Sequence, residues 1–471
     1  MSRSLLALLL ALGLAGCAAQ RPRAAPPAPV AASVDVVRHG ELWTADFHLP
    51  RPAPAWVFVH SSATRDGELP WREHDWTVET PGVRLERRGR FDLLVAENGA
   101  PVPAEVRLRF RPFAHDLLSD SAPALAFSTG AIALFSRQFD LFALSDPAAA
   151  EQLPPDLSGP NLDFTRTRAS FRDEAGPILY AGRRVSSISL DDEDGTYVLF
   201  GPAAPRVSGG IAAIIDPALP AWLRDALVRD TPAILGHLSA ALGPPPGAEP
   251  VLMVSWAGPT PRRVAMTGSV LPNLLQMTFE GEGVLRENPG LRDHALWFIA
   301  HESAHFWLGE AVAYQYARDA WITEGGADLL AFRLVSEVEP AYDGRAELQK
   351  AIDDCVRISA GRGVAAAEES GDQRASYACG TVFGLVAEAA SHRPFGAFVR
   401  RLVDENRADR VLTREEWLAG LTRVSHDPSL AADIARLIDQ GAPDPASVIA
   451  SLFSRAGVRY ARAEDGRPRL L

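Results

Sequence analysis

Apolar and polar residues alternate in several short segments of the N-terminal half of the chain. The segments 83–86 and 106–110 repeat with a period of two, which is the pattern of strands that bury one face. Two further apolar segments, 185–190 and 196–200, flank an acidic turn that ends in Asp-Gly, which predicts a hairpin between them. Together these patterns predict an N-terminal antiparallel β domain over residues 34–205.

The period changes to that of a helix after the Pro-rich segment 202–205. Residues 217–242 place their apolar side chains near one stripe of a helix. The apolar segments 251–256 and 271–279 then predict buried strands, and we expect the second to be the edge that lines the functional cleft. Helix and strand together predict an α/β domain over residues 206–393.

The C-terminal region, residues 394–471, has a helical pattern. Thr413-Arg-Glu-Glu416 has the sequence of a capping box, and residues 429–440 form a helical segment that ends at Gly441. We therefore predict a multidomain protein whose last part is a small helical cap.

The strongest chemical signal lies in an apolar segment, residues 291–308, that reads as a buried helix without Gly or Pro in its first turns. It contains the motif His301-Glu302-Ser-Ala-His305. Residues four apart share a helix face, so both imidazoles can bind one metal ion while Glu302 lies beside it as a general base. Two histidines that only pack in a core helix are the simpler alternative, and the apolar context with a matching acidic helix argues against it.

The matching acidic residues lie in a second apolar segment, residues 321–335. There Glu324 and Asp328 are four apart, on one face of the predicted helix. Glu324 is the natural third ligand, and Asp328 is suited to orient a ligand histidine. Two neutral histidines and one carboxylate, with a fourth position open to water, form a ligand set of catalytic zinc hydrolases. The sequence therefore predicts one zinc ion per chain and a zinc-activated water.

These residues resemble a known family. The run from His301 to Gly309, the eighteen residues between His305 and Glu324, and the Gly325 and Ala327 that follow are similar to the gluzincin metallopeptidases of the membrane alanyl aminopeptidase type. The glycyl aminopeptidases share the zinc spacing, so the branch stays open. The resemblance implies an N-terminal β domain and a thermolysin-like α/β catalytic domain.

The resemblance also implies a role for Tyr377, because Tyr377-Ala-Cys-Gly380 is similar to a Tyr-x-x-Gly motif of that family. There the tyrosine hydroxyl would stabilise the oxyanion of the tetrahedral intermediate. One departure matters: the family's Gly-x-Met-Glu-Asn strand holds the substrate amine by its Glu, and the chain has Gly268-Ser-Val-Leu271-Pro-Asn273 instead. Because Leu271 cannot pair with a cation, we expect relaxed or absent aminopeptidase specificity.

The N-terminus reads as a bacterial lipoprotein signal. A short polar start and the apolar residues 5–14 are typical of a cleaved signal peptide, here residues 1–16, and Leu-Ala-Gly-Cys17 resembles a lipoprotein box. Cys17 would carry the lipid, and the Pro-rich residues 17–33 would form a flexible tether. In lipoproteins, Ala18 in place of Asp after the cysteine favours the outer membrane of a Gram-negative bacterium, on its periplasmic side. The alternative for the whole N-terminal segment is an ordinary secretory signal.

Cys355 and Cys379 are the other two of the three cysteines. In an oxidising periplasm they can form a disulfide, or they can be two separate buried thiols. The sequence gives no distance between them, so both interpretations stay open.

Composition excludes one class of partner. The net charge of −12 and the absence of a Lys/Arg cluster argue against nucleic acid. We expect a peptide substrate and membrane contact through the lipid anchor only, and the sequence predicts no oligomeric state. The favoured function is a zinc metallopeptidase of the cell envelope; a zinc hydrolase of non-peptide amides and a catalytically idle zinc-binding protein are the alternatives.

Overall fold

A computed structural model describes residues 32–64, 69–118, 120–154, 157, 165–191, 195–247 and 250–471. The predicted signal peptide, Cys17 and nearly all of the predicted tether lie outside these residues. The last two residues of the predicted tether, Ala32 and Ser33, already belong to the first strand, so the predicted tether is slightly too long. No helix in the described ranges has the length and apolarity needed to cross a bilayer.

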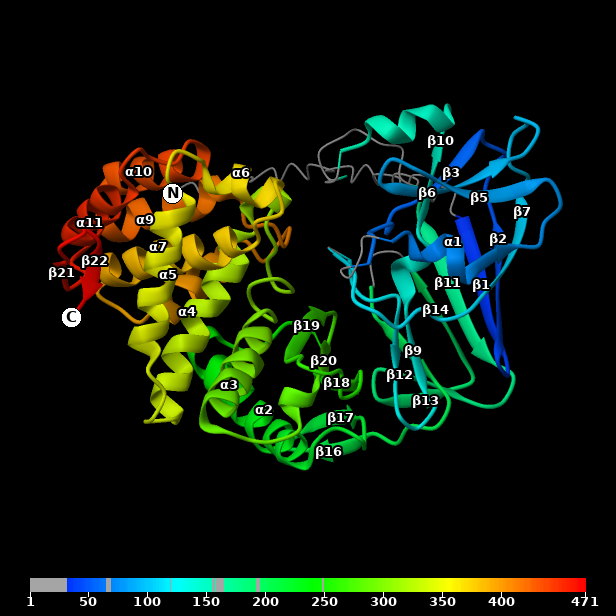
Figure 1. Ribbon diagram of the computed structural model, residues 1–471, viewed down its shortest axis with the longest axis horizontal. Coiled ribbons are helices and arrows are strands. Elements are labelled where there is room, and N and C mark those ends of the chain that lie inside the picture. The colour runs from blue at the N-terminus through cyan, green and yellow to red at the C-terminus, as the bar shows by residue number, and fades with distance from the viewer. Residues whose placement is uncertain are drawn as a thin grey trace, which may run out of the picture.

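The first lobe consists of three β-sheets (Figure 1). The largest has, in spatial order, β14 (Ser187–Asp191), β11 (Thr167–Asp173), β1 (Ala32–His39), β2 (Leu42–His48), β7 (Glu105–Phe110) and β4 (Trp76–Val78). The second has β10 (Leu141–Leu144), β3 (Ala55–Phe58), β6 (Phe91–Ala96) and β5 (Val83–Arg88). The third has β13 (Arg183–Val185), β12 (Ile178–Tyr180), β15 (Tyr197–Phe200), β9 (Ile132–Phe135) and β8 (Ala124–Ala126). The short helix α1 (Trp71–Asp75) precedes β4.

The period-two segments behave as predicted. In β7, buried Val106, Leu108 and Phe110 alternate with exposed residues, so one face of the strand joins the core. Pairing is antiparallel throughout the lobe except between β1 and β11, which run parallel.

The predicted hairpin between residues 185–190 and 196–200 is wrong. β14 pairs with β11 in the first sheet, whereas β15 pairs with β9 and β12 in the third. All four residues of β15 are buried, as an interior strand with two neighbours requires, whereas only Leu190 of β14 is buried. The two strands therefore pair with different partners although only five residues separate them in sequence.

The second domain begins with a mixed sheet of five strands. Its order is β16 (Arg206–Ser208), β17 (Ile211–Ile215), β18 (Val251–Trp256), β20 (Leu274–Glu280) and β19 (Ala265–Leu271). β17, β18 and β20 are parallel, and β19 runs antiparallel to β20 at the edge. Helix α2 (Ala221–Leu242) lies between β17 and β18 in the chain, and helix α3 (Pro289–Ala304) comes after β20.

The strand predicted over residues 271–279 is therefore not the edge. The chain turns at Pro272 and Asn273, and the φ of Asn273 is +58°. Pro lacks an N–H and Asn tolerates positive φ, which makes the pair a turn rather than the start of a strand. The apolar segment after the turn is β20, inside the sheet, and β19 is the edge that contacts α3.

The remaining chain is helical and packs at the far end from the β lobe (Figure 1). Its elements are α4 (Trp321–Val338), α5 (Gly344–Ile358), α6 (Val364–Glu369), α7 (Arg374–Ser391), α8 (Phe395–Glu405), α9 (Arg414–Ser425), α10 (Pro428–Asp439), α11 (Pro445–Ala456) and the hairpin β21 (Tyr460–Arg462) and β22 (Pro468–Leu470). The predicted capping box is present, since Thr413 and Glu416 bond each other's backbone N–H. The predicted fold class, a β domain, a central α/β domain and a helical C-terminal part, is confirmed.

Candidate metal centre

Helix α3 carries the first two predicted ligands. Asn288 caps its start by accepting a hydrogen bond from the N–H of Leu291, and Pro289 occupies the first turn, where its missing N–H costs nothing. The helix ends at Ala304, four residues earlier than the predicted 308. His305 still has helical dihedrals, with φ −67° and ψ −12°, so its imidazole stays on the same face as that of His301.

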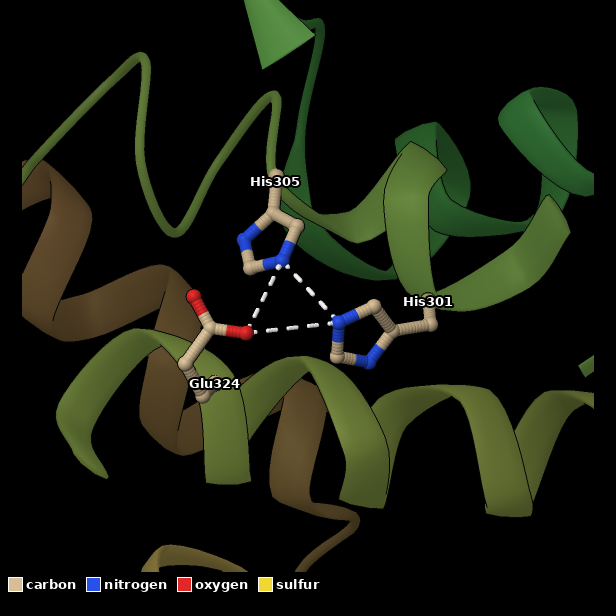
Figure 2. Close-up of side chains that lie close together, drawn as sticks. All are labelled: His301, His305 and Glu324. Carbon is tan, nitrogen blue, oxygen red and sulfur yellow. Dashed lines mark hydrogen bonds and ion pairs between the residues drawn. The ribbon is translucent and has the colours of Figure 1, made fainter. Parts of the chain in front are cut away.

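His301, His305 and Glu324 converge on one point (Figure 2). The Nε2 atoms of the two histidines lie 3.1 Å apart, and Oε2 of Glu324 is 3.5 Å from each of them. Zinc bonds of about 2.0–2.1 Å with tetrahedral angles place ligand atoms about 3.3 Å apart. The three side chains therefore have the spacing that a tetrahedral zinc ion requires, with room for a fourth ligand.

The other ring nitrogen of each histidine has a partner of its own. Nδ1 of His305 donates to the backbone oxygen of Leu308 at 2.8 Å. Nδ1 of His301 lies 2.9 Å from Oδ1 of Asp328, whose side chain is fully buried. A proton on Nδ1 of each ring, where that nitrogen faces an oxygen, leaves both Nε2 atoms with lone pairs for a metal. Asp328 thus has the orienting position that its spacing predicted.

The charges of this cluster depend on one another. Burial opposes protonation of His301, but Asp328 and Glu324 outweigh it and raise its pKa to about 10. Burial likewise opposes the ionised form of Glu324, yet His305 and His301 hold the pKa of this carboxyl well below its usual range. Without a metal, these groups therefore favour an ionised Glu324 and protonated imidazoles, and a bound divalent cation would take the place of those protons.

Glu302 lies in a tight space between α3 and the edge strand. Its side chain is buried, and this burial raises the pKa of the carboxyl. A Cβ added to Gly268 of β19 would lie 2.6 Å from Cδ of Glu302, so only glycine fits opposite the carboxylate. The strand thereby limits where the Glu302 carboxylate can move.

Tyr377 on α7 completes the cluster. Its ring stacks on the ring of His301 at 5.6 Å with an interplanar angle of 20°. Burial, together with Glu324 and Glu302, raises the pKa of the hydroxyl above its usual value. Tyr377 is therefore a neutral hydrogen-bond donor beside the predicted metal position.

Leu271 does not face this cluster. Side chains alternate along β19, so Met266 and Val270 share the face of Gly268, and Leu271 points to the other face and packs near the β lobe. The strand still offers the site no carboxylate, since the residues on the near face are Met, Gly and Val. Val270, and not Leu271, lies on the same face of β19 as Gly268.

Three other features of the site were not predicted from the sequence. They are the Leu308 carbonyl that orients His305, the fit of Gly268 against Glu302, and Arg374, whose Nη1 is 3.9 Å from Oδ2 of Asp328. An isolated glycine inside a strand does indicate a close approach, so Gly268 could have been found. The other two depend on tertiary contacts.

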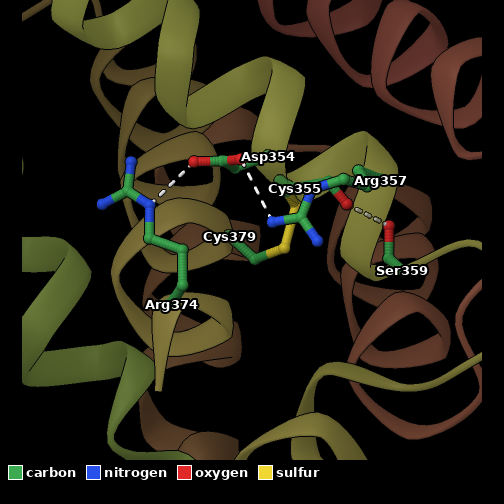
Figure 3. Close-up of a disulfide and its surroundings, with 6 residues drawn as sticks. All are labelled: Asp354, Cys355, Arg357, Ser359, Arg374 and Cys379. Carbon is green, nitrogen blue, oxygen red and sulfur yellow. Dashed lines mark hydrogen bonds and ion pairs between the residues drawn. A yellow bond between two sulfur atoms is a disulfide. The ribbon is translucent and has the colours of Figure 1, made fainter. Parts of the chain in front are cut away.

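Cys355 and Cys379 form a disulfide that joins α5 to α7 (Figure 3). Their Cα atoms are 4.8 Å apart and both side chains are fully buried. Of the two interpretations open from the sequence, the structure has the bonded one. The bond lies two residues from Tyr377 and therefore fixes the helix that carries it.

No model of a known protein family matches the sequence, and no curated protein matches it. The structure is similar to leukotriene A4 (LTA4) hydrolase from Saccharomyces cerevisiae, with a TM-score of 0.53 and 12% identity over 89% of this chain and 68% of that chain. Yeast LTA4 hydrolase in complex with Bestatin gives a TM-score of 0.51 and 14% identity over 88% and 68%. An M1 zinc metallopeptidase from Deinococcus radiodurans bound to a Tyr-Ser-Ala substrate gives 0.49 and 16% over 88% and 96%. At these identities, the likeness to LTA4 hydrolase shows a shared three-part fold.

Proposed function

We propose that this chain is a zinc metallopeptidase that hydrolyses peptide bonds. The observation that carries the proposal is the ligand triad, whose atoms are 3.1–3.5 Å apart while each histidine is fixed through its other nitrogen. His301, His305 and Glu324 would hold the ion. When bound, zinc acidifies a water molecule and polarises a carbonyl group. The fold shared with a hydrolase supports the same conclusion.

Glu302 would be the general base. Its carboxylate lies beside the ligands, and burial raises its pKa toward the range in which a base both accepts and returns a proton. It would accept a proton from the attacking water and deliver it to the leaving amine. The missing side chain at Gly268 leaves the space that the carboxylate occupies in this position.

Tyr377 would stabilise the intermediate. Its raised pKa keeps the hydroxyl protonated near neutral pH, so it can donate a hydrogen bond to the developing oxyanion. Stacking on His301 fixes the ring at the correct side of the centre.

The substrate need not have a free N-terminus. The face of β19 that carries Gly268 has no carboxylate for an amine. Glu280 is the acidic residue closest in sequence to Leu271, and it is paired with Arg263 at 2.8 Å. We infer that cleavage inside a peptide is as accessible as removal of its first residue.

For the location, we propose the periplasmic face of a Gram-negative outer membrane, with Cys17 acylated. The support is the lipoprotein-like sequence at residues 1–17, and the Cys355–Cys379 disulfide suits an oxidising compartment. Membrane fractionation of the parent and of Cys17→Ser tests it. The parent should sediment with membranes and the variant should not; a parent in the soluble fraction contradicts the anchor.

The activity is tested with the chain from residue 18 onward, by metal analysis and by digestion of a peptide library. We expect about one zinc per chain and cleavage products, because the triad is a complete ligand set with one open position. Glu302→Gln should retain zinc and lose cleavage, since an amide cannot accept the proton. Absence of zinc overturns the proposal, and zinc without cleavage of any peptide favours an idle protein or another amide substrate.

A further inference from the structure

Asp328 is a buried carboxylate whose charge needs compensation. Its side chain is fully buried on α4, and one oxygen faces Nδ1 of His301 at 2.9 Å. A buried carboxylate needs hydrogen-bond donors or cations in place of the water it has lost. His301 faces only Oδ1, so the second oxygen of Asp328, Oδ2, needs another partner.

Arg374 supplies a permanent positive charge. It is the first residue of α7, and its Nη1 lies 3.9 Å from the second oxygen of Asp328. Of the ion pairs between described residues, this is the one that joins Asp328 to a group charged at any working pH. The guanidinium touches neither Nε2 atom of the histidines nor Glu324, so any effect on the metal passes through Asp328.

The guanidinium is itself held in place. Its Nε donates to Oδ2 of Asp354 on α5 at 2.8 Å, directly beside the disulfide (Figure 3). Cys355 follows Asp354, so the disulfide and the ion pair join the same two helices. Arg374 also precedes Tyr377 by one helical turn, and residues three apart share a helix face. One face of α7 thus contacts both Asp328 and His301.

We propose that Arg374 is a positioning residue for the metal centre. Its guanidinium, held by Asp354, lies beside the second oxygen of Asp328 and keeps the carboxylate directed at His301. Asp328 in turn fixes the ring orientation that presents Nε2 to zinc. The inference rests on the proposed zinc site and adds a residue that no ligand motif contains. Loss of an outer hydrogen-bonding partner of a ligand typically weakens metal binding by about 10–100-fold. Because Arg374 acts one step further out, we expect the lower end, about tenfold.

The test is the zinc dissociation constant, measured by competition with a chelator on the chain from residue 18 onward. Arg374→Met, which removes the charge and keeps the length, should weaken zinc binding about tenfold. Arg374→Lys should recover most of the affinity, because a cation remains near Asp328. The melting temperature of the metal-free protein is measured in parallel, since a purely structural role would lower it equally in both variants.

Arg333→Met is the matched control. Arg333 pairs with Glu388 at 2.6 Å across the same two helices, α4 and α7, and its exposed fraction of 44% is close to the 39% of Arg374. This variant loses an ion pair of the same kind without touching Asp328. It should bind zinc as the parent does.

Equal zinc affinity in Arg374→Met and the parent overturns the proposal, as does a loss that Arg374→Lys does not restore. If Arg374→Met does not fold, the zinc affinity of Asp354→Asn tests the proposal instead. This variant frees the guanidinium from its anchor and should weaken zinc binding by a smaller factor. Unchanged zinc affinity in Asp354→Asn overturns the proposal. If the unmodified protein binds no zinc, the proposed function itself is refuted. Failure of the proposed function can thus be told apart from failure of the role proposed for Arg374.

Discussion

Gly325 and Gly380 touch backbone to backbone where α4 crosses α7. A Cβ on Gly325 would lie 2.2 Å from the carbonyl carbon of Gly380, and a Cβ on Gly380 would lie 2.1 Å from the backbone oxygen of Trp321. No side chain fits at either position, so the two helices approach more closely than any pair of alanines would permit. Glu324 directly precedes one glycine and Tyr377 precedes the other by one turn, so this contact sets the separation of a ligand from the predicted oxyanion donor.

Gly380→Ala should force α7 away from α4. Overpacking of this kind costs typically about 1–3 kcal/mol of unfolding free energy, and the shift should also move Tyr377 and lower kcat. Denaturant unfolding and steady-state kinetics measure both effects. Gly236→Ala in α2 is the control, because no atom lies within 4 Å of its added Cβ. That variant should gain up to about 1 kcal/mol from helix propensity, and a similar gain for Gly380→Ala would refute the contact.

Gly268→Ala should impair the general base without harming the fold. The new Cβ would meet Cδ of Glu302 at 2.6 Å, and a flexible carboxylate can move away at little cost in stability. We therefore expect kcat to fall at least about tenfold, since proton transfer by a placed base contributes about 10²–10⁴-fold, with zinc content and melting temperature retained. A loss of zinc would instead mean that the strand supports the ligands.

Tyr377→Phe removes the hydroxyl and keeps the ring that stacks on His301. Loss of one oxyanion donor should lower kcat by about 10²–10³-fold and change KM little, because the hydroxyl acts on the intermediate rather than on the bound substrate. Tyr460→Phe, at the C-terminal hairpin, serves as the control, since its hydroxyl bonds only to helix α11 among the described residues. An unchanged kcat for Tyr377→Phe would assign the residue to packing.

The features that the sequence predicted well are those fixed by local spacing. His301 and His305 are four apart on one helix, and Glu324 and Asp328 are four apart on another, so their relative directions follow from helix geometry. The capping box at Thr413 is equally local.

The features that the sequence missed depend on contacts between distant segments. β14 and β15 are neighbours in sequence, but each strand pairs with a different sheet that only the whole lobe defines. The ion pair of Arg374 with Asp328 joins two helices whose docking is set by Gly325 and Gly380, and no local pattern contains that distance. Leu271 stands at the position of the family's Glu in sequence, but it packs on the far face of β19, because side chains alternate along a strand.

The last prediction concerns the substrate N-terminus. A free α-amine is a cation, and a cleft that selects it needs a negative partner. The near face of β19 carries Met266, Gly268 and Val270, and Glu280 is already paired with Arg263. We therefore expect one peptide with a free and with an acetylated N-terminus to be cleaved with kcat/KM values that differ by less than about tenfold. A decrease of a hundredfold or more on acetylation, equivalent to about 3 kcal/mol of amine recognition, would show that another carboxylate anchors the amine and that the chain is a true aminopeptidase.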